Sequence, residues 1–161
     1  INKTQIRYIL MKKLLGIVVL SLFLNSNAFS FNFPQSLMDY KKKNKGVESD
    51  IYMMNRCSAV FNWYGSYLIK SNEINKSSIF LEASSNMLEY SIIIYSKTRN
   101  LDFNKSHKVM SDRLMSLINF YEEDSKKLFL QNGNYLSGHI MDDLGICSAT
   151  LQELKEKIKR N

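Results

Sequence analysis

The 161-residue sequence has little proline, glycine, histidine or cysteine, and these scarcities exclude several classes of protein. One proline and six glycines are too few for an all-β protein with many tight turns. Neither of the two histidines completes a Glu-x-x-His motif, which excludes the paired motif of di-iron helical bundles. A P-loop and a glycine-rich dinucleotide fingerprint are also missing from the sequence. We therefore predict no catalytic residues and no cofactor.

A short apolar run near the N-terminus predicts export. Residues 11–30 (MKKLLGIVVLSLFLNSNAFS) contain two lysines, an apolar run at 14–24 and small residues suited to signal peptidase at 26–28 or 28–30. The apolar run is about half the roughly 20 residues that a membrane-spanning helix needs. We expect residues 1–30 to be upstream residues plus a cleavable signal peptide of a bacterial protein that is periplasmic or secreted. An uncleaved N-terminal anchor is the alternative; after cleavage we expect no stable membrane insertion.

The mature chain is predicted to be weakly basic. Cleavage removes four basic residues and no acidic one, which lowers the formal net charge from +7 to +3. The only cluster among the basic residues that remain is at 41–45, in what resembles a solvated linker. A nucleic-acid-binding protein would concentrate its basic residues on one face. We therefore expect no nucleic-acid partner.

The regular part of the mature chain shows the spacing of amphipathic helices. Apolar residues recur at steps of three and four over 49–71, 77–98, 105–132 and 137–160. In the first segment, for example, the apolar positions are Met54, Cys57, Phe61, Tyr64 and Leu68. Short links between four long helices predict an all-α fold, an antiparallel up-and-down four-helix bundle over 49–161. Residues 31–48 are interpreted as an N-terminal arm or a short helix.

The two cysteines occupy inward positions on the first and the last predicted helix. An exported protein with one pair of cysteines normally oxidises them, so we predict a disulfide between Cys57 and Cys147, joining the first and last helices. A CxxC redox motif is missing, and neither cysteine has a histidine beside it to share a zinc ion. Two buried free thiols and a metal site are the alternatives.

One weak candidate for metal binding or acid–base chemistry lies at the start of the last predicted helix. His139 and Asp143 are four residues apart on one helix face, and Asp142 is adjacent. Together they could form half of a metal site or an acid–base pair, with His107 as a further partner. The simpler interpretation is a solvated imidazole and carboxylates near the positive end of a helix.

The first two predicted helices carry more apolar surface than a four-helix bundle requires. The surplus includes five residues that we regard as a candidate partner surface: Val60, Trp63, Tyr67, Ile92 and Tyr95. It could be covered by residues 31–48 or by packing within the domain, by a protein partner or a second copy, or by a small apolar ligand. We predict a non-enzymatic binding protein, such as an inhibitor, immunity-like factor, adaptor or chaperone. A metal-binding or enzymatic module and a carrier of a small apolar ligand are the alternatives.

Overall fold

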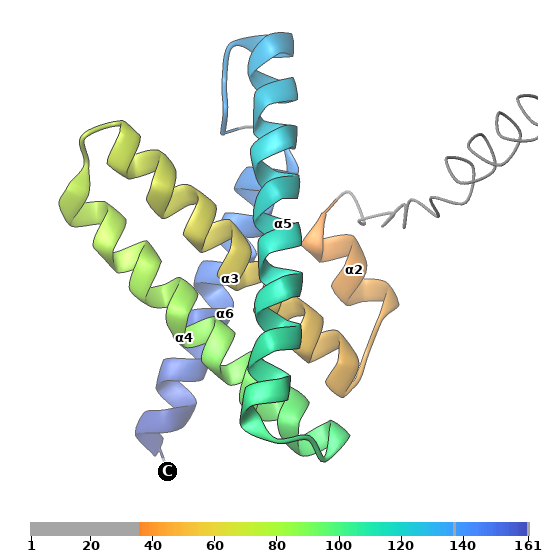
Figure 1. Cartoon of the computed structure of the whole chain (residues 1–161). Helices are drawn as coiled ribbons and strands as arrows, with labels where there is room; N and C mark the ends of the chain where they lie inside the picture. The colour runs from red at the N-terminus through yellow and green to blue at the C-terminus, as the bar shows by residue number, and fades with distance from the viewer. Residues whose placement is uncertain (1–35, 137, 161) are drawn as a thin grey trace, which may run out of the picture. The chain divides into compact units, whose positions relative to one another are not determined.

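The computed structural model describes residues 36–136 and 138–160, and within them every regular element is a helix (Figure 1). The all-helical prediction is confirmed for these residues. The predicted signal peptide at 1–30 lies outside them. No helix in the described ranges is long and apolar enough to cross a membrane. The helices are α2 (Leu37–Lys43), α3 (Val47–Lys70), α4 (Ile74–Arg99), α5 (Phe103–Asn132) and α6 (His139–Arg160).

Helix α3 is the centre of the fold. Every residue from 54 to 61 is buried, which places other parts of the chain around the full circumference of this helix. Helix α3 packs against each of the four other described helices. A helix that is apolar on all sides is stable when it is surrounded. This explains why its sequence carries a second apolar stripe beside the first.

Helices α3 and α4 form a closely packed antiparallel pair. Small residues line their contact: Ser58 and Ser84 exchange hydrogen bonds from each hydroxyl to the other residue's carbonyl oxygen, both at 2.8 Å. Two turns further along, the Ser77 hydroxyl donates to the Gly65 carbonyl oxygen at 2.9 Å. Small side chains allow the backbones of α3 and α4 to approach each other. The buried serine hydroxyls then donate hydrogen bonds to carbonyl oxygens of the opposite helix. The three-residue turn between the helices contains Asn72, which has a left-handed backbone (φ 62°).

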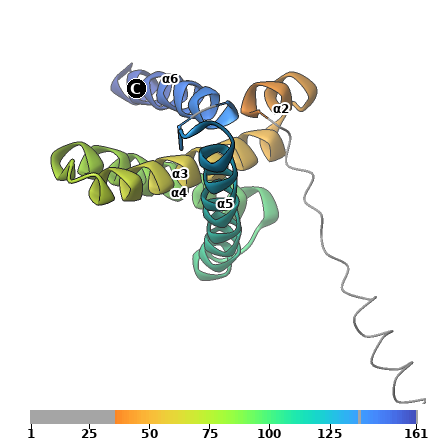
Figure 2. The ribbon, with the colours of Figure 1, turned by 90° about the horizontal axis from the view of Figure 1, so that it is seen from above.

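Helix α5 crosses the α3–α4 pair steeply, while α6 and α2 lie on the other side of α3 (Figures 1 and 2). Asp102 begins α5 by accepting a hydrogen bond from the Lys105 amide at 2.9 Å, and Gly133 ends it in the left-handed conformation (φ 72°). Beneath this crossing, Ile51, Ile92, Tyr95 and Met110 form a buried cluster. The side chains of α3, α4 and α5 thus share one core.

The predicted up-and-down four-helix bundle is not confirmed. The described residues form five helices, and α2, which lies within the segment 31–48, packs against α6 and α3. In an up-and-down bundle α5 and α6 would lie side by side along their length. Instead, the contacts described between them are near the start of α6, where Tyr121 and Asp124 of α5 meet Asp143 and His139. The physical reason is that α2 occupies part of the surface of α6.

The disulfide between Cys57 and Cys147 is present, with an S–S distance of 2.03 Å and Cα atoms 5.2 Å apart. It joins α3 to α6, which are the second and the last of the five described helices, so the predicted link between the first and last helices is not confirmed because α2 precedes α3. Both cysteines are fully buried. The bond therefore fixes α6 against the central helix from inside the core.

Candidate functional site

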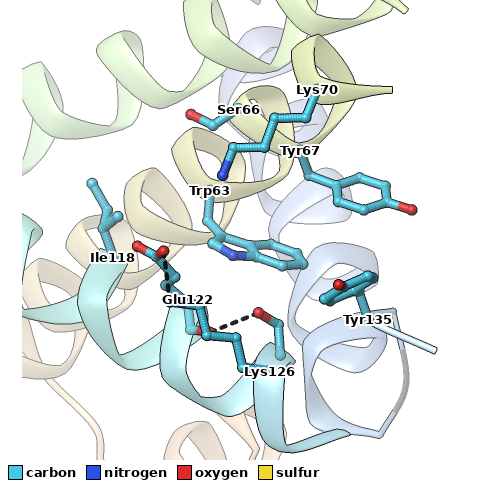
Figure 3. Close-up of a pocket in the computed structure, with 9 residues that line it drawn as sticks. Trp63, Ser66, Tyr67, Lys70, Ile118, Glu122, Lys126 and Tyr135 are labelled. Atoms are coloured by element: carbon cyan, nitrogen blue, oxygen red, sulfur yellow. Dashed lines mark hydrogen bonds and ion pairs between the residues drawn. The ribbon is translucent and has the colours of Figure 1, made fainter. Parts of the chain in front are cut away.

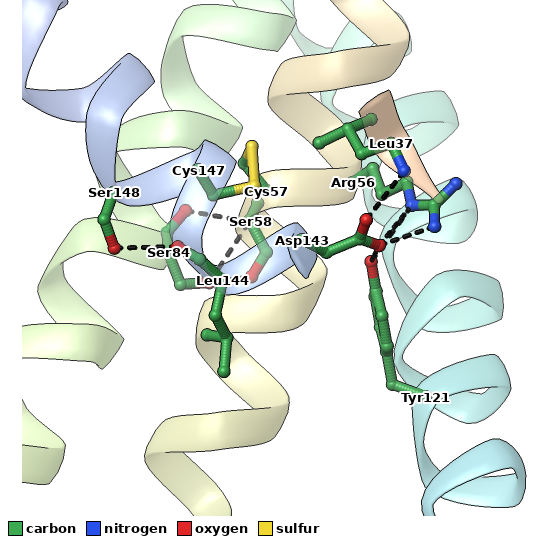
Figure 4. The surroundings of a disulfide bond; sticks show 10 residues. All are labelled: Leu37, Arg56, Cys57, Ser58, Ser84, Tyr121, Asp143, Leu144, Cys147 and Ser148. Carbon is green, nitrogen blue, oxygen red and sulfur yellow. Dashed lines mark hydrogen bonds and ion pairs between the residues drawn. A yellow bond between two sulfur atoms is a disulfide. The ribbon is translucent and has the colours of Figure 1, made fainter. Parts of the chain in front are cut away.

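A buried ion pair lies one helical turn from the disulfide (Figure 4). Arg56 of α3 and Asp143 of α6 both have fully buried side chains, and Arg56 donates to Asp143 Oδ2 from Nε at 2.9 Å and from Nη2 at 2.5 Å. The Tyr121 hydroxyl of α5 donates to the same oxygen at 2.6 Å. Tyr52 accepts from Arg56 Nη1 at 3.4 Å. A buried charge needs a partner and further hydrogen bonds, and this network supplies both.

Asp143 also anchors the short helix α2. Its second carboxylate oxygen, Oδ1, accepts a hydrogen bond from the backbone amide of Leu37 at 2.7 Å. Leu37 is the first residue of α2 and is fully buried. The rings of Tyr40 and Tyr52 add a contact, with centroids 4.2 Å apart. One carboxylate thus connects α2, α3, α5 and α6.

The burial of this network shifts the ionisation of its members. Burial raises the pKa of Tyr121 well above that of a solvated tyrosine, and Arg56 opposes this rise. Burial likewise raises the pKa of Tyr52. Burial alone would lower the pKa of Arg56, but the interactions with Tyr121 and Asp143 outweigh it and raise this pKa. Both tyrosines are neutral and the arginine is charged at physiological pH.

The four residues considered for metal or acid–base chemistry do not come together. The oxygens of Asp143 accept hydrogen bonds from Arg56, Tyr121 and Leu37, so the carboxylate cannot bind a metal without breaking the ion pair. Asp142 is exposed, and His107 lies on exposed surface of α5. In the described part of the chain, no three His, Cys, Asp or Glu side chains are grouped to hold a metal ion. Asp143 lies near the start of α6, as the simpler interpretation has it, but the residue is fully buried and paired with Arg56.

His139 lies in a separate, half-buried position. Its Nε2 is 3.1 Å from Asp124 Oδ2 of α5, within ion-pair range but not aligned for a hydrogen bond. Its ring also contacts Phe120, with centroids 5.8 Å apart. The histidine therefore contacts α5 from the first residue of α6, away from Asp143.

Most of the candidate partner surface is inside the fold. Val60 is fully buried, and Trp63, Ile92 and Tyr95 are each at most 9% exposed. The expectation that these residues share an exposed surface is wrong, because other helices cover them: Trp63 contacts Tyr121 of α5, with ring centroids 6.5 Å apart. Tyr67 alone of the five remains half-buried. Packing within the domain therefore accounts for most of the apolar surplus of α3 and α4.

The part of this surface that stays accessible is a cleft of about 570 Å³ between α3 and α5 (Figure 3). We call it the aromatic cleft. Its rings are Trp63 and Tyr67 of α3 and Tyr135 of the segment before α6, and its charged groups are Lys70, Glu122 and Lys126. Trp63 and Tyr67 lie nearly parallel, with centroids 6.0 Å apart. Tyr135 is 6.0 Å from Tyr67 and stacks on Phe129 at 4.2 Å.

The charged groups of the aromatic cleft are unequally paired. Lys126 forms an ion pair with Glu122 along α5, with Nζ 3.0 Å from Oε1. A hydrogen bond from Lys126 lowers the pKa of Glu122, and the charge of Lys70 adds a smaller effect. Lys70, in the last turn of α3, forms no ion pair with any described residue within 4 Å. The cleft thus has two ammonium groups and one carboxylate around an aromatic interior.

Sequence reasoning missed the ion pair and the position of the cleft. Arg56 directly precedes Cys57, and Asp143 lies one turn before Cys147. Once the disulfide is predicted, these opposite charges lie within one helical turn of it on both helices, which is a usable signal. Tyr135 carried no comparable signal, because it is in the irregular segment between two helices.

Comparisons with known proteins add no assignment. No family model matches the chain, and neither the curated proteins nor the solved structures contain a significant match.

Proposed function

We propose that the protein is an exported, non-enzymatic binding protein whose binding site is the aromatic cleft. The observation that carries the proposal is the convergence of Trp63, Tyr67 and Tyr135 around an accessible space of about 570 Å³. Small-molecule sites are commonly concave, lined mostly by apolar and aromatic side chains, and about 300–1,000 Å³ in volume. The aromatic cleft falls within this range of volume, and its three aromatic rings and Ile118 share the lining with two serines, two lysines and one glutamate.

The rest of the fold supports such a site by holding its walls in place. The disulfide and the Arg56–Asp143 pair both connect α3 to the first half of α6. Tyr135 lies a few residues before α6, so fixing the start of α6 also limits where its ring can be. A preorganised site loses less conformational entropy when a ligand binds.

The buried disulfide and the signal-like residues 11–30 support a periplasmic or secreted location. The alternative of a metal-binding or enzymatic module built on His139, Asp142 and Asp143 has less support, because Asp143 is held by Arg56. We therefore propose that the protein acts by binding another molecule.

A fluorescence titration tests the proposal. Trp63 is the only tryptophan of the chain, so its emission reports on the cleft without labelling. N-phenyl-1-naphthylamine, an uncharged aromatic probe, should bind the purified exported protein at one site and quench Trp63 by energy transfer. Tyr67→Ala should weaken binding at least about fivefold, because a ring contact is worth roughly 1 kcal/mol. Tyr90→Ala, at a half-buried tyrosine of α4 outside the cleft, is the matched control. Absence of binding, or equal binding by both variants, would contradict the proposal.

A protein partner or a second copy of the chain is the second candidate. The observation that favours it is the exposure of Phe129 and Leu130, 41% and 84%, at the end of α5 beside Tyr135. Light scattering after size-exclusion chromatography tests the homodimer. A dimeric mass that Leu130→Asp converts to a monomeric mass would favour it, and a monomeric mass for the unaltered protein would remove it.

A further inference from the structure

We propose that the aromatic cleft selects small apolar molecules that carry one negative charge, and that the Lys70 ammonium is their counter-ion. This inference rests on the proposed function and adds the chemical class of the ligand. Three steps lead to it: the cleft has an apolar interior, its charges do not favour a cation, and one of its cations is not neutralised.

The apolar part of the ligand is defined by the interior of the cleft. Trp63 is only 7% exposed and lines this space. Tyr67 and Tyr135 lie next to each other on one side of Trp63, and Ile118 of α5 adds an aliphatic side chain on the other (Figure 3). Aromatic groups of a ligand gain both apolar burial and ring contacts in such a space.

The charge of the ligand is defined by the mouth of the cleft. Three aromatic rings could in principle surround a cation, as aromatic cages do for quaternary ammonium groups. Here, however, a cation would face Lys70 and Lys126, and the one carboxylate, Glu122, is already paired with Lys126. A second positive charge is therefore disfavoured, and a negative charge is favoured.

Lys70 is the group left to meet that negative charge. It extends from the end of α3 over the cleft, opposite Lys126 of α5 (Figure 3). The last carbonyl oxygens of α3 already accept hydrogen bonds from the turn that follows, from Ser71 to Tyr67 at 3.0 Å and from Glu73 to Leu68 at 2.9 Å. Among the described residues, none holds the Lys70 ammonium group in a hydrogen bond or an ion pair, so this group can meet a carboxylate or sulfonate at the rim.

A matched pair of probes tests the charge preference. 8-Anilino-1-naphthalenesulfonate is N-phenyl-1-naphthylamine with one added sulfonate, so the two differ in a single anionic group. Lys70→Gln should weaken binding of the sulfonate about fivefold or more and change binding of the neutral probe less than about twofold, because it removes only a charge-assisted hydrogen bond. Glu122→Gln should strengthen binding of the sulfonate, because it removes the one negative charge of the cleft. Lys97→Gln, at an exposed lysine in the last turn of α4, is the control and should change neither.

The outcomes separate this inference from the proposed function. If both probes bind and Lys70→Gln affects them equally, or affects neither, the charge preference is wrong while the cleft remains a binding site. If the neutral probe binds and the sulfonate does not, the charge preference is also wrong. If neither probe binds the folded protein, the proposed function fails together with the inference.

Discussion

Arg56 and Asp143 form a buried ion pair directly beside the disulfide that joins the same two helices. Arg56 precedes Cys57 on α3, and Asp143 lies one turn before Cys147 on α6. The two cross-links differ in what they contribute. The disulfide restricts the unfolded chain, whereas the ion pair selects one arrangement of helices in the folded state, since any other arrangement would leave a buried charge unpaired.

Removing one partner of the ion pair should be far more costly than replacing both. We expect Arg56→Met to lower the free energy of unfolding by about 3–5 kcal/mol, because it leaves the buried Asp143 carboxylate uncompensated. The double variant Arg56→Met/Asp143→Leu should lose less than either single variant. Denaturant unfolding followed by Trp63 emission measures all three. Asp112→Asn, which breaks the exposed Lys108–Asp112 pair, should change stability little and is the control. Equal losses for Arg56→Met and Asp112→Asn would contradict the assigned role of the buried pair.

The disulfide should contribute a large share of the stability of the fold. It closes a loop with a sequence separation of 90 residues, for which the chain-entropy relation gives about 4–5 kcal/mol. We expect Cys57→Ala/Cys147→Ala to lose this amount in denaturant unfolding at neutral pH. Because both cysteines are fully buried, a reductant should open the bond of the folded protein slowly and that of the unfolded protein quickly. A loss below about 1 kcal/mol, or fast reduction of the native protein, would show that the bond is less important than its loop length predicts.

Local features of the fold could be predicted from the sequence, and the arrangement of the helices could not. The predicted segments 77–98 and 105–132 correspond to Ile74–Arg99 and Phe103–Asn132, and Gly133 ends α5 in the left-handed conformation. These features depend on periodicity and on one glycine, which are local. Which helix covers which face depends on contacts far apart in sequence, and the spacing of apolar residues does not identify the neighbour.

The inward face of α4 shows this limit in detail. Buried serines at 77, 84 and 91 lie seven residues apart on this helix, and Tyr90 and Ile94 are only half-buried. Serine is common on surfaces, so its spacing was not a clear signal of a core position. The serine spacing indicates a core position only when it is read together with the contact residues of α3, Ser58 and Gly65, which are also seven residues apart. The same applies to the aromatic cleft, which needs α3, α5 and Tyr135 together.

Alkaline pH should destabilise the protein through the tyrosines of the buried network. Burial raises the pKa of Tyr121 and Tyr52 in the folded state, while in the unfolded chain both ionise near pH 10. Above about pH 10 the unfolded state therefore loses protons that the folded state retains, and stability falls as pH rises; below that pH neither group contributes to a slope. Each tyrosine adds up to about 1.4 kcal/mol per pH unit. Denaturant unfolding between pH 8 and 11.5 should show a smaller slope for Tyr121→Phe than for the unaltered protein. An identical slope would mean that Tyr121 ionises as readily in the fold as in the unfolded chain.

Two helix-interior glycines should respond to alanine with opposite signs. A Cβ at Gly65 would lie 2.9 Å from both Cγ and Cδ2 of Leu81, so the close approach of α3 and α4 leaves no space for it. Overpacking costs about 1–3 kcal/mol, and the better helix propensity of alanine returns at most about 1 kcal/mol, so Gly65→Ala should destabilise the fold. A Cβ at Gly145 of α6 would meet nothing within 4 Å, so Gly145→Ala should stabilise the protein by about 0.5–1 kcal/mol. Thermal and denaturant unfolding of the two variants, side by side, measure the difference. If Gly65→Ala stabilises the protein as much as Gly145→Ala does, Leu81 can move aside, and the small residues of α3 and α4 are not what sets the distance between these helices.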